Sequence, residues 1–329
     1  MDVVHALKSS APFSHLTPAE LEALARSLSP LKVPGGAEIV RQDDSTRDAY
    51  LLAGGSVKIQ RDTPYGRYDL ASLGAGDLFG EASFIDLLGR SGDVLTETEC
   101  DLLLFSPESL APVLDADPRL NLALHWAFWK SLSDKLRRAN QHLLAFFADP
   151  GQRPDHPSAY AKSPTGSFQI GLAQKKQLFE EQKLTPMEIN FLATLSKAKQ
   201  LPAGEIVFRE GEPGDRMYIV LDGQVMISKQ IPGVGEEALA FLTRGDYFGE
   251  MALIDNLPRS ADAKAHAGGA VVLAISSDVL SGILDIGKVS SLRLLKLLCS
   301  LIAKRLREID EKIVGWFMLG GGSPPEGLP

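Results

Sequence analysis

The stretch DYFGEMALIDNLPRSADA at residues 246–263 decides the fold, because it recurs earlier in the chain as DLFGEASFIDLLGRSGDV at residues 77–94. Each copy has one glutamate directly after Phe-Gly and an Arg-Ser pair that begins nine residues after that glutamate. Charged residues set among apolar ones are costly to bury unless each has a partner. The pattern therefore requires either an internal ion pair or a ligand that satisfies both charges.

The recurring stretch is part of a repeat that covers most of the chain. Three further pairs of segments match in the same order, at 16–28 and 184–196, 38–59 and 205–227, and 134–147 and 304–317. The offset between the copies is 168 residues at position 16, 169 at the cassette glutamate and 170 near the end of the repeat. Such a constant offset indicates a duplication.

The repeat predicts the domain organisation. We expect a first domain at 1–147 and a second at 168–319. The segment between them, 148–167, is rich in proline, glycine and serine, which is typical of a linker. The Gly/Pro-rich tail at 320–329 is expected to be flexible.

Composition indicates a soluble globular protein. The 329 residues are enough for about two domains, and 44% of them are hydrophobic, which is normal for a folded chain. A formal charge of −8 argues against a nucleic-acid coat, which needs a basic surface. Cys100 and Cys299 are too few for a disulfide framework, and no signal peptide is visible. We expect a cytoplasmic protein without a membrane span, because charges interrupt its most apolar late stretch.

Local signals follow the same order in both copies. Thr-Pro-x-Glu predicts a helix start capped by Thr17 in the first copy and by Thr185 in the second. Short apolar runs separated by glycines follow, and such runs favour a jelly roll or barrel. Each copy then ends in a long helix with one apolar stripe. That stripe packs either on its own barrel, which we favour, or in a dimer seam or lid.

The glutamate and the arginine suit different parts of one ligand. Arg259 offers a permanently charged, two-pronged contact to a phosphate, and Ser260 adds a hydroxyl and a backbone N–H. A short helix between the two charges would have free N–H groups at its first turn, which also suit an anion. Glu250 is anionic and suits a sugar hydroxyl instead. Phosphate and sugar together indicate a compact nucleotide; the alternative is an internal Glu–Arg ion pair that closes the loop.

Both copies resemble cyclic-nucleotide-binding domains, the family of protein kinase A regulatory subunits, cyclic-nucleotide-gated channels and the bacterial catabolite activator protein. Residues 248–253 and 258–261 are similar to the family's phosphate-binding cassette, F-G-E-(L/M/I)-A-L followed by P-R-(A/S/T)-A. The resemblance covers roughly 13–147 and 179–317. It implies an α+β, mainly β fold: two tandem eight-stranded β-rolls, or jelly rolls, each with flanking helices and a long C-terminal helix that caps the pocket.

The resemblance also assigns ligand-binding residues. It implies that Glu250 takes the ribose 2′-hydroxyl and Arg259 the exocyclic phosphate oxygens, with Glu81 and Arg90 in the same roles in the first copy. The remaining expected ligand contacts are Gly249, Met251, Ala252, Ser260 and Ala261 in the second copy, and Gly80, Ala82, Ser83, Ser91 and Gly92 in the first. We expect no catalytic residue and no metal ligand.

The first copy departs from the family pattern around its cassette. Ser83-Phe84 stands in place of Ala-Leu, Gly89 replaces the proline and Gly92 replaces the final alanine. We expect the two glycines to loosen the loop, because glycine has the least restricted backbone. The sequence leaves open whether this first site functions.

Both copies place an aspartate directly after the cassette, Asp93 and Asp262. A carboxylate facing inward would repel phosphate, so we expect both to point to solvent. The ligand's base is expected to meet the closing helix, where the candidates are Ser131 and Lys135 in the first copy and Ser300 and Lys304 in the second. With serine after each arginine, cAMP is favoured over cGMP, and a cyclic dinucleotide such as c-di-GMP stays open.

The sequence shows no output module of its own. No helix-turn-helix, channel, cyclase, kinase or phosphodiesterase motif is visible, and the histidines are too scattered for a metal-binding barrel. We therefore expect a receptor that is not an enzyme, has no cofactor and does not bind DNA directly. Its layout is similar to that of the kinase regulatory subunit, and its effector protein is unknown.

The expected mechanism is a population shift. Ligand pulls each cassette inward and the following helix closes as a lid, so that movement of the first helix re-aims the second copy. The apolar second helix is the first candidate for the effector surface, and a homodimer through the long helices is also open. The basic run KLRRANQ at 135–141 is expected on the solvated face of its helix.

Overall fold

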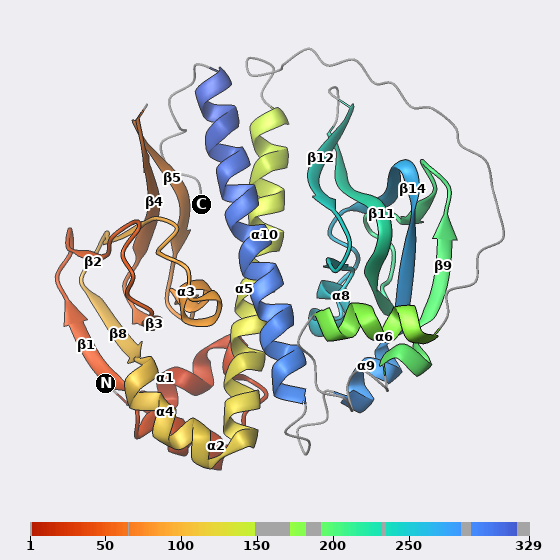
Figure 1. Ribbon diagram of the computed structural model, residues 1–329. Coiled ribbons are helices and arrows are strands. Elements are labelled where there is room, and N and C mark those ends of the chain that lie inside the picture. Colours follow the sequence, from red (N-terminus) through yellow and green to blue (C-terminus); the bar gives the residue numbers. More distant parts are fainter. Residues whose placement is uncertain are drawn as a thin grey trace. The chain divides into compact units, whose positions relative to one another are not determined.

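The chain forms two compact units, shown in Figure 1 as a computed structural model that describes residues 2–64, 66–148, 172–181, 192–231, 235–283 and 291–320. Unit 1 contains residues 1–136 together with those from Ile302 onward, and unit 2 contains residues 137–301. The predicted linker beyond residue 148, the tail beyond 320 and the Thr185 cap lie outside the described residues. The domain boundaries at 147 and 168 stay predictions.

Unit 1 holds the predicted eight-stranded β-roll. Its strands are β1 (Ser29–Val33), β2 (Glu38–Val40), β3 (Ala49–Gly54), β4 (Val57–Thr63), β5 (Gly66–Leu73), β6 (Leu78–Phe79), β7 (Asp93–Thr96) and β8 (Cys100–Phe105). They pair antiparallel in two four-stranded sheets, in the orders β1-β8-β3-β6 and β2-β7-β4-β5. An apolar layer that includes Leu52, Phe79 and Leu102 fills the space between the sheets.

Helices flank this roll, and some of them gather at one of its ends. They are α1 (Val3–Ser9), the 3-10 turn η1 (Ala11–Phe13), α2 (Pro18–Ala25), α3 (Glu81–Asp86), α4 (Pro107–Ala116) and α5 (Pro118–Ala148), which continues into unit 2 from Arg137 onward. Figure 1 shows α1, α2 and α4 gathered together there, and leucines of all three share one core cluster with Phe105 and Phe128. The predicted cap of α2 is confirmed: Thr17 and Glu20 form a capping box.

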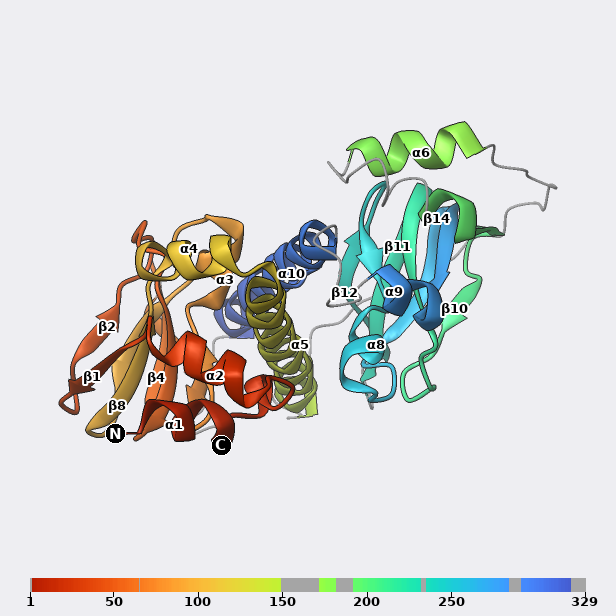
Figure 2. The same ribbon diagram turned by 90° about the horizontal axis from the view of Figure 1, so that it is seen from below.

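Unit 2 repeats the roll with longer strands. Its elements are α6 (Leu172–Glu181), β9 (Lys197–Leu201), β10 (Ile206–Phe208), β11 (Arg216–Ile231), β12 (Gly235–Leu242), β13 (Tyr247–Phe248), α8 (Met251–Asp255), β14 (Asp262–Ser276), α9 (Ser277–Ile283) and α10 (Ser291–Gly320). Figure 2 shows α8 and α9 against the sheet formed by β11 and β14. Strand β11 covers the positions of both β3 and β4, and β14 covers those of β7 and β8, so the described strands number six instead of eight.

Glycines make the corners between these merged strands. Gly55 separates β3 from β4 with φ +88°, and Gly223 bends β11 at the matching place with φ +75°. A side chain at either position would collide with a backbone carbonyl, that of Glu99 just before β8 or that of Gly269 within β14. Both corners therefore need glycine, whether or not the ladder of hydrogen bonds continues through the bend.

The long second helix differs from our expectation. Its residues from Ile302 onward, including the buried Ile309 and Ile313, belong to unit 1 and so pack with the first copy's barrel instead of their own. The apolar stripe was correctly located, but periodicity alone does not say which apolar surface covers it. None of the helices in the described ranges is long and apolar enough to cross a membrane.

Candidate functional site

Each cassette begins with a glycine, because a side chain at that position would collide with the guanidinium of the cassette arginine. Gly80 ends β6 with φ +81° and Gly249 ends β13 with φ +78°, which only glycine adopts without strain. An added Cβ would lie 2.8 Å from Nη1 of Arg90 in the first cassette and 2.7 Å from Nη1 of Arg259 in the second. The Phe-Gly-Glu motif thus places a short helix immediately after a turn that the guanidinium packs against.

The two arginines are buried and hold matching positions. Arg90 donates to the carbonyls of Gly80 (3.3 Å) and Asp48 (2.7 Å). Arg259 donates in the same way to the carbonyls of Gly249 (2.5 Å) and Arg216 (2.7 Å). Burial lowers the pKa of both guanidinium groups from the usual arginine value. Within the described ranges every hydrogen-bond acceptor of the two groups is a neutral oxygen.

The third guanidinium nitrogen distinguishes the cassettes. Nε of Arg90 donates to Oγ1 of Thr46 at 3.1 Å. Gly214 occupies the position of Thr46 in the second copy, and Nε of the buried Arg259 has no hydrogen-bond acceptor among the described residues. The ring of Phe208 lies 4.2 Å below this guanidinium instead. The guanidinium of Arg259 is therefore a desolvated cation in which one N–H donor has no acceptor among the described residues.

Glu81 does not pair with Arg90, so an internal Glu–Arg ion pair does not close the first loop. The carboxylate is 1% exposed and accepts from Nζ of Lys135 at 2.6 Å and from Oγ of Ser131 at 2.9 Å. Both donors lie on α5 and were our candidates for contacting the base of the ligand. The structure places them on the glutamate expected to take the ribose hydroxyl.

Their counterparts in the second copy contact other groups. Oγ of Ser300 donates to the carbonyl of Lys296 at 3.0 Å, and Nζ of Lys304 lies 3.8 Å from Glu308 on the same helix. Glu250 is 2% exposed, and its charge opposes the pKa lowering of Arg259. The two acidic residues are thus equally buried, but the first is covered by the helix that follows its own roll.

The other expected ligand residues of the second cassette line the same short segment. Met251, Ala252 and Ala261 are buried, and Oγ of Ser260 lies 3.8 Å from Sδ of Met251. Gly249, Glu250 and Arg259 adjoin them, so the structure brings all seven predicted residues of this cassette into one loop and helix. Their contact with a ligand stays a prediction.

The first cassette is tighter than we expected. Gly92 is buried, and a side chain there would collide with the carbonyl of Gln60 in β4, so this glycine permits close packing and does not loosen the loop. Ser83 is buried and donates to the carbonyl of Gly89 at 3.4 Å, while Ala82 and Ser91 are half-buried. Phe84 packs edge-on against Phe128 of α5, with ring centroids 5.1 Å apart, which joins the cassette to the long helix.

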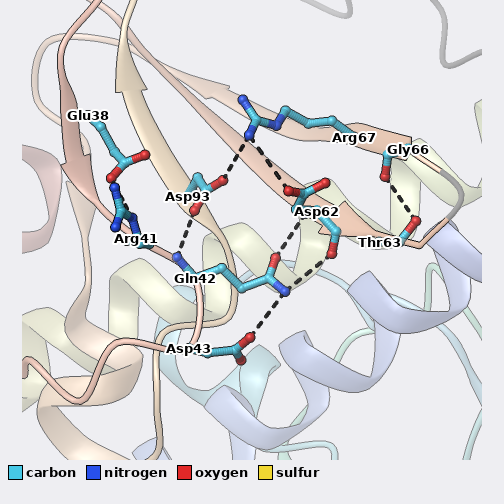
Figure 3. Close-up of polar contacts among 9 residues, drawn as sticks. All are labelled: Glu38, Arg41, Gln42, Asp43, Asp62, Thr63, Gly66, Arg67 and Asp93. Carbon is cyan, nitrogen blue, oxygen red and sulfur yellow. Dashed lines mark hydrogen bonds and ion pairs between the residues drawn. The ribbon is translucent and has the colours of Figure 1, made fainter.

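The prediction that Asp93 and Asp262 point to solvent is wrong. Asp93 is 5% exposed, accepts the backbone N–H of Gln42 at 2.7 Å and lies 3.8 Å from a guanidinium nitrogen of Arg67. Figure 3 draws both of these contacts. Asp262 likewise accepts the backbone N–H of Glu210 at 2.7 Å. Each carboxylate satisfies a buried amide beside the cassette, which explains why the duplication keeps an acid there.

Sequence reasoning missed two further sets of residues. The first is the residue beside Nε of each cassette arginine, Thr46 or Gly214, which lies about 44 residues upstream and carried no motif. The second set is a pair of arginines on the long helices. Arg137, expected on a solvated face, donates to Asp255, and Arg307 donates to Asp86. The sequence did contain a sign of this pair, because both arginines and both aspartates occupy matching positions of the repeat.

Comparison with known proteins adds the family. The family model described as "Cyclic nucleotide-binding domain" matches residues 30–117 and 198–286, together more than half of the chain. Each match contains one cassette, from Gly80 to Gly92 or from Gly249 to Ala261.

Relatives of several kinds share this similarity. A "CRP-like cAMP-activated global transcriptional regulator" of Mycobacterium tuberculosis is 35% identical over 133 residues, which are 39% of this chain and 56% of that protein. A cAMP-dependent protein kinase regulatory subunit of Yarrowia lipolytica is 24% identical over 254 residues, 77% of this chain and 53% of that protein. The regulatory domain of Toxoplasma gondii PKA, solved with cAMP, is 21% identical with a TM-score of 0.32, covering 88% of this chain and 93% of that one. The chain spans about half the length of the two curated relatives.

Proposed function

The chain belongs to the family of cyclic nucleotide-binding domains, and on that premise we propose that it is a cyclic-nucleotide receptor with one ligand site in each cassette. Arg90 and Arg259 bind the exocyclic phosphate, and Glu81 and Glu250 accept a hydrogen bond from the ribose 2′-hydroxyl. The loop residues beside them complete each site. cAMP is favoured over cGMP and c-di-GMP as the ligand.

One observation carries this proposal: the guanidinium of Arg259 is buried and only partly hydrogen-bonded. Its guanidinium is 5% exposed, its described acceptors are neutral carbonyls, and its Nε has no acceptor in the described part of the chain. Burial of this cation is costly because its hydrogen-bond acceptors are neutral and the charges of Glu250 and Asp215 only partly oppose the lowering of its pKa. An anionic ligand would offset that cost. The motif repeats this arrangement around Arg90, where Thr46 supplies the third acceptor.

The receptor acts by binding and not by catalysis. Ligand entry changes the cassette, the change passes through the contact between α3 and α5, where Phe84 meets Phe128, and an effector protein reads it. The effector is unidentified, direct DNA binding is not expected, and a homodimer through the long helices remains one form the receptor could take. We place it in the cytoplasm.

Calorimetric titration of folded, ligand-free protein with cAMP, cGMP and c-di-GMP tests the proposal. We expect heat with cAMP, and we expect Arg259→Ala to weaken binding at the second site by about 30-fold or more, because truncating one member of a buried charge pair costs about 2 kcal/mol or more. Arg26→Ala, which removes an exposed arginine of a surface pair, serves as the control.

Each outcome of the titration tests the choice of ligand, the role of Arg259 or the receptor function. Heat with c-di-GMP alone would identify a dinucleotide receptor, and heat with cGMP alone would reverse the base preference. Unchanged affinity in Arg259→Ala would remove this residue from the phosphate site. No heat with any of the three nucleotides would sink the receptor function itself.

A second candidate function has specific support. Lys135 and Ser131 already bind the carboxylate of Glu81, so the ribose hydroxyl must share or displace these contacts. In this alternative only the second cassette binds nucleotide and the first is an interaction module. A stoichiometry of one that Arg259→Ala abolishes would support this alternative, whereas a stoichiometry of two would exclude it.

A further inference from the structure

Arg307 lies on α10, the helix that follows the second copy, and donates hydrogen bonds to three residues of the first cassette. We call this set of arginine contacts a grip. Nε of Arg307 donates to Asp86 at 3.0 Å and its Nη2 to the same carboxylate at 3.3 Å. Nη1 donates to the carbonyl of Gly89 at 3.0 Å, and Nη2 also reaches Oγ of Ser83 at 3.2 Å. All these residues belong to unit 1. One side chain therefore holds the end of α3, a serine within α3 and the residue directly before Arg90.

Arg137, on the helix that follows the first copy, makes the same contacts with the second cassette. Its Nε and Nη2 donate to Asp255 at 2.6 and 3.0 Å, and its Nη1 donates to the carbonyl of Pro258 at 2.8 Å. Pro258 directly precedes Arg259. These residues all belong to unit 2. The second grip thus repeats the first, atom for atom, on aspartate and carbonyl.

Both grips are more than surface ion pairs. The side chains of Arg137 and Asp255 are 12% and 13% exposed, and those of Arg307 and Asp86 are 15% and 7% exposed. Each aspartate also accepts the backbone N–H two residues ahead, from Leu257 or from Leu88, at 3.0 Å. Two-pronged arginine contacts in partly desolvated surroundings are stronger and more directional than exposed pairs.

The repeat makes the pattern reciprocal. Arg137 and Arg307 match each other in the duplication, and so do Asp86 and Asp255. Yet each arginine reaches the cassette of the copy that its helix does not follow. We propose that Arg307 positions the first ligand site and Arg137 the second, so that each site is held in its binding shape by the helix of the other copy.

The physical reason is preorganisation. The tips carry exposed leucines, Leu87, Leu88 and Leu257, and offer the loop little packing of their own. The arginine on the helix replaces that packing by holding the carbonyl next to the phosphate arginine. Without it the loop must be ordered when ligand binds, which lowers affinity. Arg137 and Arg307 act here as positioning residues and do not touch the ligand.

The inference rests on the proposed function, and cAMP titration of single-site variants tests it. Arg90→Ala leaves only the second site and Arg259→Ala leaves only the first. In the Arg90→Ala background we expect Arg137→Ala to weaken cAMP binding about tenfold, and Arg307→Ala to change it less than about twofold. In the Arg259→Ala background the two effects should exchange places. Each helix arginine acting on its own copy's site, or on both sites equally, would overturn the proposal.

A ligand-independent measurement separates this inference from the proposed function. Hydrogen exchange in the nucleotide-free protein should show that Arg137→Ala lowers protection of the Leu257 amide about tenfold while Leu88 is unchanged. Arg307→Ala should do the reverse. This crosswise pattern is expected even if no nucleotide binds, and unchanged protection at both tips would refute the grips themselves.

Rescue distinguishes positioning from general damage. A cation restored at position 137 should recover protection and affinity that Arg137→Ala loses, because Asp255 and the carbonyl of Pro258 both remain as acceptors. Arg137→Lys should recover only part, because lysine cannot make the two-pronged contact. Arg26→Ala should leave both readouts unchanged, because Arg26 takes part only in an exposed pair with Glu22. Equal losses in Arg137→Lys and Arg137→Ala would count against positioning.

Discussion

The first cassette gives its arginine three neutral acceptors and covers its glutamate with a lysine, whereas the second leaves one nitrogen of Arg259 without an acceptor above a phenyl ring. The motif Gly-Glu followed by Arg-Ser is the same in both. The differences come from residues outside it: Thr46 against Gly214, and Val40 against Phe208 at the same register position. A shared motif fixes the backbone of a site, but distant side chains decide how much of its charge is already satisfied.

The largest expected effect comes from removing the lysine that pairs with Glu81 in the first cassette. Lys135→Met would leave the carboxylate of Glu81, only 1% exposed, without its cation. We expect a loss of about 3 kcal/mol of stability in unit 1, because an uncompensated buried charge remains. Hydrogen exchange of α3 and α5, together with urea unfolding, measures this loss.

The second copy provides the control for that prediction. Lys304, our candidate lysine on the closing helix of the second copy, makes only a 3.8 Å contact with Glu308, and its side chain is 61% exposed. Lys304→Met should therefore change stability by less than about 0.5 kcal/mol. Equal losses in the two variants would show that the cassettes differ less than their contacts indicate.

The next effect concerns the space beside Arg259. A Cβ at Gly214 would lie 2.5 Å from Cβ of Ala252 and 2.7 Å from Cζ of Arg259. Gly214→Ala should destabilise unit 2 by about 2 kcal/mol through overpacking, as measured by hydrogen exchange of β11. Thr46→Val, the matching change in the first copy, keeps the volume and removes the hydroxyl acceptor of Arg90, so about 1 kcal/mol is expected. A larger loss for Thr46→Val than for Gly214→Ala would reverse the comparison.

A pH-dependent effect should appear in unit 1. Burial raises the pKa of Asp310 to about 7, while the nearby Arg61, Lys135 and Arg307 lower it and Glu311 raises it. The folded pKa lies above that of an unfolded aspartate, so the protonated form favours folding. Stability should fall as pH rises from about 4 to 7 and then stay level.

Asp310→Asn removes this dependence. We expect it to stabilise unit 1 by about 1.5 kcal/mol at pH 8 and by much less at pH 4.5; this is below the full linkage value because Asp310 is only half-buried. Urea unfolding at the two pH values measures the difference. A gain of equal size at both would mean that Asp310 does not titrate in this range.

The smallest effect lies at the tips. Leu87 and Asn256 end the two cassette helices in the left-handed region, with φ +60° and +53°. Asparagine tolerates this conformation, whereas leucine is strained there. Leu87→Asn should stabilise the first cassette by about 1 kcal/mol, and Asn256→Leu should cost the second about the same. Thermal unfolding of both variants checks the sign, and changes of the same sign in both would contradict the explanation.

The sequence predicted most of what short-range rules control. The cap at Thr17, the Gly corners, the roll in each copy and the glycine before each cassette glutamate follow from local backbone preferences and from the repeat. The family match then agrees with the resemblance that the cassette motif carried.

Long-range contacts were not predictable in the same way. The burial of Asp93 depends on the amide of Gln42, about 50 residues away, and the cover of Glu81 depends on which face of α5 meets the cassette. The apolar stripe of α10 was visible, but its placement with the first barrel was not. Periodicity identifies a face to be buried, whereas the partner of that face is a property of the whole fold.

The division of α10 between the units has a consequence for synthesis. The strands of the first barrel end at Phe105, but unit 1 is complete only after the residues from Ile302 onward have left the ribosome. The second copy is therefore translated before unit 1 can be completed. During that interval the cassette tip lacks Arg307, and apolar surface that α10 will cover stays open. The order of the repeats in the chain thus makes the first-synthesised cassette the last to gain all of its contacts, because Arg307 follows Asp86 by 221 residues.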